Sequence, residues 1–329
     1  MEDVARSCGV TAATVSRVLN HKSDNFSARE SVRQKIWEAT RELGYVLDSS
    51  ARSLSTGATR VIGLFASPQT HVAEGINEAM IEGIAETFHG GGYEVFFGMT
   101  PARPDRDRLP VWRFDGAVLM QGPKSETVAE LDERGVPYIC VNERVGQAVA
   151  HVIADDCLGM NRLISHLMQL GHKRFAYANV RVADATHYSV FDRYNALLAA
   201  ASEGTIKLVS GHETPFESAT DFLRKTVLEQ GATAIIAYDH RRAAMLLGAA
   251  NEMGLKIPAN FSLVCFNDVF PVAILHPPLT VVRVPGRDMG HIAAELLLNH
   301  LISPQRHLGK EVRVPEDLIV RASTAPPPA

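Results

Sequence analysis

The chain has 329 residues, which is enough for two or three domains. It carries 33 Lys and Arg against 37 Asp and Glu, and the net charge of −4 is only a weak argument against nucleic-acid binding, because such binding needs no more than a local basic face. No run of about 18 apolar residues occurs, which excludes a membrane-spanning helix. The N-terminus also lacks a basic start followed by an apolar stretch, so we expect a cytoplasmic protein.

Several kinds of site have no sequence signal here. The four cysteines are scattered, with no Cys-x-x-Cys pair among them: Cys8, Cys140, Cys157 and Cys265. This spacing favours reduced thiols over a disulfide framework or a zinc site. The sequence also lacks a Gly-x-Ser-x-Gly nucleophile elbow, a His-Glu-x-x-His zinc motif and a Walker loop. We therefore expect no enzyme, no metal and no cofactor.

Residues 4–20 predict two short helices joined by a tight turn. Gly9 stands where the backbone must turn left-handed, which glycine does at no steric cost, and Thr11 suits the N-cap of the second helix. That helix places three apolar residues on one face: Val15, Val18 and Leu19. The small Ala5 lets the two helices cross closely. The pattern indicates a helix-turn-helix, with an ordinary αα-hairpin inside a globular core as the alternative.

The other face of the second helix is then free to enter the major groove of DNA. Arg17 can donate two hydrogen bonds to a guanine edge, or it can contact phosphate alone. Ala12 and Ala13 offer only methyl groups, which suit the methyl group of thymine. The neighbouring hydroxyl and amide side chains can bind phosphates and fix the register. The candidate DNA-contacting residues of this stretch are Thr11, Ala12, Ala13, Thr14, Ser16, Arg17 and Asn20.

A third helix ends at Gly44 and completes a small three-helix unit. It carries apolar residues at helical spacing: Val32, Ile36, Ala39 and Leu43. Residues 46–57 then have a helical pattern with poor propensity, because four of them are serines. We expect this segment to be loosely ordered on its own.

From Val61 onward, short strands alternate with helices. The expected strands are Val61–Phe65, Tyr93–Met99, Gly116–Met120, Tyr138–Val141, His151–Asp155, Arg174–Val180, Ala234–Tyr238, Ser262–Asp268 and Val281–Pro285. The expected helices include Ala73–His89, Leu158–Leu170, Ser189–Ser202, Glu217–Glu229, Arg241–Met253 and Arg287–Ile302. This alternation predicts parallel sheets covered by helices, and the length of the region favours two sheets.

Several motifs resemble one known family. They are Asp3-Val4-Ala5, Thr14-Val15-Ser16-Arg17-Val18-Leu19-Asn20, Ile62-Gly63-Leu64, Asp155-Asp156-x-x-Gly159, Leu170-Gly171-His172-Lys173-Arg174 and Pro277-Pro278-Leu279-Thr280. Together these resemble the lactose-repressor and purine-repressor (LacI-type) family of transcription regulators. The resemblance implies an all-α helix-turn-helix headpiece at 1–45 and a hinge helix or linker at 46–60. It further implies an α/β sensor domain at 61–325 like the periplasmic binding proteins, followed by a disordered tail at 326–329.

The resemblance also implies how the sensor is built and which residues work at each site. The sensor has two subdomains joined by three crossovers, and the last segments return to complete both halves. In the hinge, Ala51, Arg52 and Leu54 match the family pattern, and Leu54 would pry open a base step in the minor groove. A plain flexible linker is the alternative.

The effector would lie in the cleft between the two subdomains. Arg193 would clamp it with a planar guanidinium, and Phe216 would offer an aromatic face. The remaining candidates follow strands: Ser67, Gln69, Thr70, Asp239 and Asn267. Every candidate of this site, Arg193 and Phe216 included, has a surface or capping role as its alternative.

These expectations combine into one predicted function. The protein would be a homodimeric transcription regulator, and a repressor, that binds a near-palindromic operator in double-stranded DNA. A small effector, a sugar or related metabolite, would control operator affinity. The alternative is a solute-binding or sensory protein with the same α/β fold and no role on DNA.

Overall fold

The computed structural model describes residues 1–19, 28–45, 58–66, 75–99, 114–120, 122, 125–179, 187–211, 213, 216–304 and 309–328. The chain forms two compact units, residues 1–59 and 60–329, which are described separately. Among the described residues, no helix is both long and apolar enough to cross a membrane.

The first unit contains three described helices: α1 (Glu2–Cys8), α2 (Ala12–Leu19) and α3 (Glu30–Glu42). Gly9 adopts the left-handed conformation at a φ of 68°, and its N–H bonds the carbonyls of Ala5 and Arg6, as the turn between α1 and α2 requires. Among the described residues of this unit, seven buried side chains form the core: Val4, Ala5, Val15, Val18, Leu19, Ile36 and Ala39. The predicted inward face of α2 is therefore confirmed.

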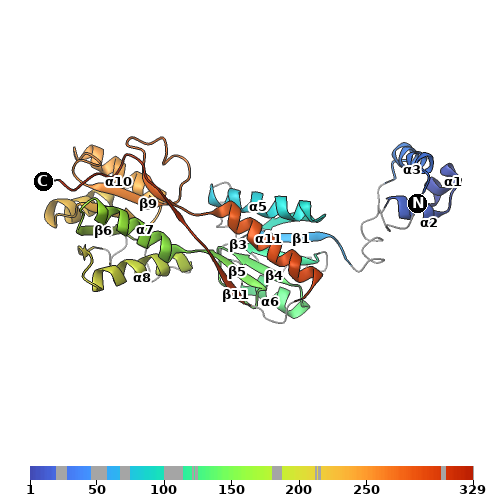
Figure 1. The fold of residues 1–329 in the computed structure, drawn as a ribbon, viewed down its shortest axis with the longest axis horizontal. Coiled ribbons are helices and arrows are strands. Elements are labelled where there is room, and N and C mark those ends of the chain that lie inside the picture. The colour runs from blue at the N-terminus through green and yellow to red at the C-terminus, as the bar shows by residue number, and fades with distance from the viewer. Residues whose placement is uncertain are drawn as a thin grey trace. The chain divides into compact units, whose positions relative to one another are not determined.

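The described strands of the second unit form two six-stranded sheets, each in its own lobe (Figure 1). Lobe A is the sheet with order β11-β5-β4-β3-β1-β2, in which all neighbours are parallel. Its strands are β1 (Val61–Ala66), β2 (Glu94–Met99), β3 (Gly116–Met120), β4 (Tyr138–Val141), β5 (Ala150–Ala154) and β11 (Lys310–Val314). Its helices are α5 (Ile76–Gly90), α6 (Ser125–Arg134) and α11 (Gly286–Ile302).

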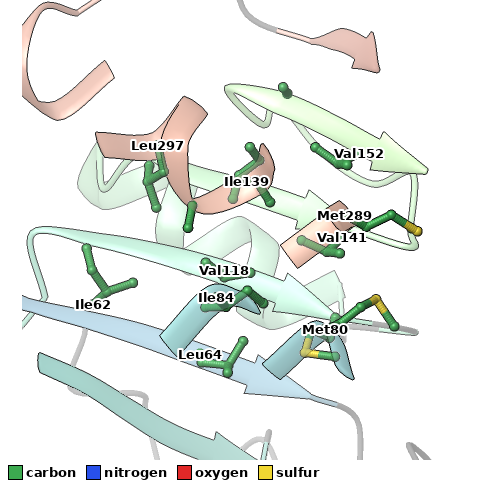
Figure 2. Close-up of a cluster of buried hydrophobic side chains, with 14 of the residues drawn as sticks. Ile62, Leu64, Met80, Ile84, Val118, Ile139, Val141, Val152, Met289 and Leu297 are labelled. Carbon is green, nitrogen blue, oxygen red and sulfur yellow. The ribbon is translucent and has the colours of Figure 1, made fainter. Parts of the chain in front are cut away.

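Helices α5 and α11 lie side by side on one face of this sheet. Figure 2 shows Met80 and Ile84 of α5, with Met289 and Leu297 of α11, gathered over apolar side chains of the strands such as Val118. These four helix residues are fully buried. The two helices cross closely because glycines face the opposite backbone, so a side chain on Gly83 or Gly290 would collide with it.

Lobe B is the sheet with order β12-β10-β9-β8-β6-β7, parallel except for the antiparallel pair β10 and β12. Its strands are β6 (Arg174–Ala178), β7 (Lys207–Leu208), β8 (Ala234–Ala237), β9 (Ser262–Phe266), β10 (Thr280–Arg283) and β12 (Asp317–Ile319). Its helices are α7 (Asp156–Gln169), α8 (Tyr188–Ser202), α9 (Ala219–Leu223), which continues as a π-helix over Arg224–Glu229, and α10 (His240–Glu252).

Within the described residues the chain passes between the lobes three times. The first passage joins β5 to α7 at Asp155, and the second joins β10 to α11 through residues 284–285. The third joins β11 to β12 through Pro315 and Glu316. Each lobe is thus completed by a segment from the C-terminal part of the chain: α11 and β11 in lobe A, and β12 in lobe B. Side chains near the three passages lie close to both lobes.

The C-terminal segment is bonded to lobe B. The carbonyl of Ala325 accepts from Nε2 of His172 at 2.8 Å, and its N–H donates to Oγ of Ser262 at 3.1 Å. His172 is buried, and Thr324 meets His166 at 3.1 Å in the same region. The chain is therefore tied down as far as Ala325, and the disordered tail expected at 326–329 stays a prediction.

Candidate functional site

The outward face of α2 is the candidate DNA surface. Ala13 and Arg17 are exposed one turn apart, while Ala12, Thr14 and Ser16 are half-buried. This face follows from the sequence pattern, because the buried face of α2 anchors the helix to α1 and α3. The surface can present one guanidinium and small side chains to a groove.

Thr11 has the capping role expected for it. Its Oγ1 accepts from the N–H of Thr14 at 3.2 Å and lies 2.9 Å from Oγ1 of Thr14. Thr11 therefore fixes the start of the helix that carries Arg17. The other predicted DNA-contacting residues lie outside the described residues: Asn20, Ala51, Arg52 and Leu54.

In the sensor, polar residues follow three strands at the carboxyl edge of the lobe B sheet. Asn179 follows β6, Asp239 follows β8, and Asn267 follows β9. In parallel sheets this edge is where ligands bind. Of the residues predicted for the effector site, Ser67, Gln69 and Thr70 lie outside the described residues.

Asp239 has a structural role at this edge. One carboxylate oxygen accepts from the backbone N–H of Arg242 at 2.9 Å and caps α10, and the other lies 2.7 Å from the guanidinium of Arg242. Both oxygens of Asp239 are thus bonded to Arg242 in the first turn of α10, where they stabilise the start of the helix. This is the capping alternative named for Asp239, and its binding role stays a prediction.

Asn267 and Phe216 are half-buried and lie in lobe B. Asn267 has a φ of 78°, which is uncommon for a residue other than glycine, and its Nδ2 lies 3.5 Å from Nδ1 of His240. Phe216 packs edge-on against Phe222, with ring centroids 5.5 Å apart. Its N–H bonds the carbonyl of Asn179 at 3.3 Å, which ties Phe216 to the same edge.

Arg193 of α8 is 4% exposed and lies where the first and third passages meet. Its Nε lies 2.5 Å from Oδ1 of Asp156, and Nη1 donates to the carbonyl of Tyr238 at 2.8 Å. The guanidinium also lies 3.8 Å from the centroid of the Phe266 ring. These donors are directed at the protein's own groups, so Arg193 has a structural role here and its role as an effector clamp stays a prediction.

Glu316 is the second carboxylate beside Arg193. It is fully buried, its Oε1 lies 4.0 Å from Nη2 of Arg193, and neither oxygen has a hydrogen-bond partner within the described part of the chain. Its carboxylate occupies the space that a side chain on Gly159 would take. Burial raises the pKa of Glu316 well above its usual range, Asp156 raises it further, and Arg193 opposes them. Glu316 therefore favours its neutral form.

A hydrogen-bond network that the sequence analysis did not identify connects the two lobes. Nε2 of His187 bonds the carbonyl of Asn142 at 2.9 Å, and the hydroxyl of Tyr188 donates to Oδ1 of Asn142 at 2.7 Å. Ser189 continues the network to the hydroxyl of Tyr238 at 2.7 Å. Burial lowers the pKa of His187, which favours the neutral imidazole. The one available signal was position, because Asn142 directly follows β4 and His187 caps α8.

Comparisons with known proteins give the family. The profile of bacterial regulatory proteins of the lacI family matches residues 1–48, and that of the periplasmic binding protein-like domain matches residues 164–324. The chain is 31% identical over 352 residues to the HTH-type transcriptional regulator in the aml 5′ region of Streptomyces limosus, with 99% of this chain and 94% of the relative covered. This chain belongs to the lacI family. As a lacI-family protein it is a DNA-binding transcriptional regulator, and α1 and α2 are its helix-turn-helix.

Two solved structures share the fold of this lacI-family chain. The cellobiose complex of the regulator CelR matches with a TM-score of 0.68 at 23% identity, covering 98% of this chain and 99% of that one. The Lac repressor dimer bound to operator and the anti-inducer ONPF matches with a TM-score of 0.75 at 22% identity, covering 98% of each chain. At these identities the likeness concerns the fold alone.

Proposed function

We propose that this lacI-family regulator is a repressor that binds a near-palindromic operator as a homodimer. We further propose that a small effector, a sugar or related metabolite, binds between lobes A and B and alters operator affinity. The single observation that carries the proposal is the exposed face of α2, with Arg17 and Ala13 one turn apart on a helix anchored by its buried side.

On the DNA side, we assign Arg17 to a guanine edge and the alanines to thymine methyl groups. The helix start is preset by Thr11 and Thr14, so little rearrangement is needed for the helix to enter a groove. We assign the remaining contacts to the same stretch and to the hinge: Thr11, Thr14, Ser16, Asn20, Ala51, Arg52 and Leu54. In this proposal the headpiece spans 1–45, the hinge 46–60, and the sensor 61–325 with a tail at 326–329.

On the effector side, we assign the carboxyl edge of the lobe B sheet to ligand binding. Asn267 offers an amide and Phe216 an apolar face there, and these are the groups that fix the hydroxyls and the ring of a sugar. The cellobiose bound to the structurally similar CelR supports a sugar as the class of effector. The Lac repressor structure, a dimer on operator DNA, supports the homodimer.

A solute-binding or sensory protein without a DNA role is the alternative. The first unit disfavours it, because a solute-binding protein has no use for a separate helix-turn-helix. We assign no catalytic step to the chain, and we place it in the cytoplasm because that is where a bacterial operator lies.

A gel-shift titration of the full-length protein tests the proposal. The probe is the DNA upstream of its own gene, at moderate salt, with scrambled duplex of the same composition as control. We expect specific binding, and we expect one member of a panel of mono- and disaccharides to change the apparent affinity at least about tenfold, in line with common coupling energies. Equal affinity for both duplexes would contradict the DNA role.

A further inference from the structure

Four charged side chains form a closed ring of ion pairs where lobe A meets α8. Arg144 lies 3.1 Å from Asp192 through Nη2 and 2.8 Å from Glu311 through Nε. Arg313 lies 3.3 Å from the same oxygen of Asp192 through Nη1 and 2.7 Å from Glu311 through Nε. Each guanidinium thus contacts both carboxylates.

The members of the ring are divided unequally between the lobes. Arg144 follows β4, and Glu311 and Arg313 lie on β11, so these three belong to lobe A. Asp192 lies on α8 of lobe B. Glu311 pairs with both guanidiniums within lobe A, and Asp192 is the one member of the ring that comes from lobe B.

The surroundings strengthen this contact beyond that of an ordinary surface pair. The side chain of Asp192 is only 17% exposed, which limits screening by salt. The guanidinium of Arg144 also lies 4.7 Å from the centroid of the Tyr188 ring, another residue of α8. Asp192 directly precedes Arg193 in the sequence, and Arg193 pairs with Asp156 beside the first passage. The ring is therefore adjacent to the buried ion pair between the lobes.

We propose that Arg144, Asp192, Glu311 and Arg313 form a latch that holds lobes A and B in the arrangement of this structure. Opening the lobes separates Asp192 from both guanidiniums at once. The two like charges then keep Glu311 and, at 4.0 Å from Arg313, Asp155 of the first passage as their neighbouring carboxylates. We call the arrangement of this structure closed and an arrangement with separated lobes open. The latch thereby sets the ratio of open to closed molecules before any effector binds. Its effect on operator affinity rests on the proposed function, but the latch itself does not.

Inter-lobe distances measured by pulsed electron spin resonance test the latch. Spin labels are carried by non-canonical residues at the exposed positions 133 of α6 and 252 of α10, in the full-length protein, which keeps the four native cysteines. Labelled protein is diluted with unlabelled protein, so that each dimer reports one intramolecular distance. We expect Asp192→Asn to add a longer-distance population and to raise the open-to-closed ratio about fivefold, since two partly buried pairs are lost.

A second variant and a matched control complete the test. Arg144→Gln removes one of the two pairs to Asp192, so we expect a smaller rise in the same direction. Asp221→Asn is the control, because Asp221 pairs with Arg224 at 2.8 Å within lobe B alone, and we expect it to leave the distances unchanged. Distance distributions for Asp192→Asn and Arg144→Gln that both superimpose on the parent would overturn the latch. Because no ligand is used, that result would leave the proposed repressor function intact.

Discussion

Replacing Arg193 by methionine should lower the free energy of unfolding of the sensor by several times what one lost ligand contact would cost. The side chain of Arg193 is 5% exposed, that of Asp156 is 0% exposed, and their closest atoms are 2.5 Å apart. Methionine keeps much of the apolar volume but leaves Asp156 buried without its cation. Breaking such a pair by removing one partner costs about 3–5 kcal/mol. In a domain of this size that corresponds to a melting temperature lower by roughly 10 °C.

Thermal and urea denaturation of the full chain would measure this loss. The double variant Arg193→Met with Asp156→Asn removes the stranded charge, so we expect it to be more stable than Arg193→Met alone. Arg224→Met is the matched control, because its pair with Asp221 lies on the surface and should contribute only about 0.5 kcal/mol. A cost below about 1 kcal/mol for Arg193→Met, or simple additivity in the double variant, would refute the structural role of Arg193.

Three further predictions concern the operator and the pH dependence of stability. Arg17→Ala should weaken specific operator binding by about 1–3 kcal/mol in a fluorescence titration, while Arg6→Ala, which removes an exposed arginine paired with Asp3, should have a much smaller effect. Leu54→Ala should reduce the operator bend seen in circular-permutation gels, and an unchanged bend would remove the wedge role. Glu316→Gln should gain stability relative to the parent as pH rises above the ordinary pKa range of a glutamate, because the pKa of Glu316 is raised in the folded protein. The raised pKa of Glu316 stabilises the parent at low pH, and this contribution is lost as pH rises through the pKa of the folded state. Melting temperatures of the two proteins that change equally with pH would contradict the prediction.

Local features of the headpiece were predictable from the sequence because they depend on neighbours in the chain. Gly9 and Thr11 act within one turn of their own positions, and the apolar spacing of α2 determines its buried face. Leu43 is an exception: the pattern places it on the inner face of the third helix, yet it is 51% exposed. Its N–H still bonds the carbonyl of Ala39 at 3.0 Å, so Leu43 continues the helical path, but the described core of this unit does not extend as far as this position.

Alternation of strands and helices predicted the two sheets, but not every strand. β11 carries three charged residues in five, and β12 has three residues in all, so neither shows a hydrophobic run. They form because β5 and β10 offer backbone partners from distant parts of the chain. Only the family resemblance implied that the last segments return to both halves.

The contacts of the candidate site could not be predicted, since they depend on tertiary structure. Arg193 meets Asp156, Tyr238 and Glu316, which lie 37, 45 and more than 100 positions away. No periodicity encodes such a choice of partners. The sequence named Arg193 as a key residue, but the structure was needed to find that its donors face the protein interior.

Operator recognition by α2 can be measured by selecting bound duplexes from a random pool, with the full-length protein and with Arg17→Ala in parallel. We expect an enriched inverted repeat for the parent protein, with one base pair of each half-site losing its preference in Arg17→Ala. Recovery of no repeat, or of the same repeat with the same preferences by both proteins, would contradict the claim that this face of α2 recognises the operator.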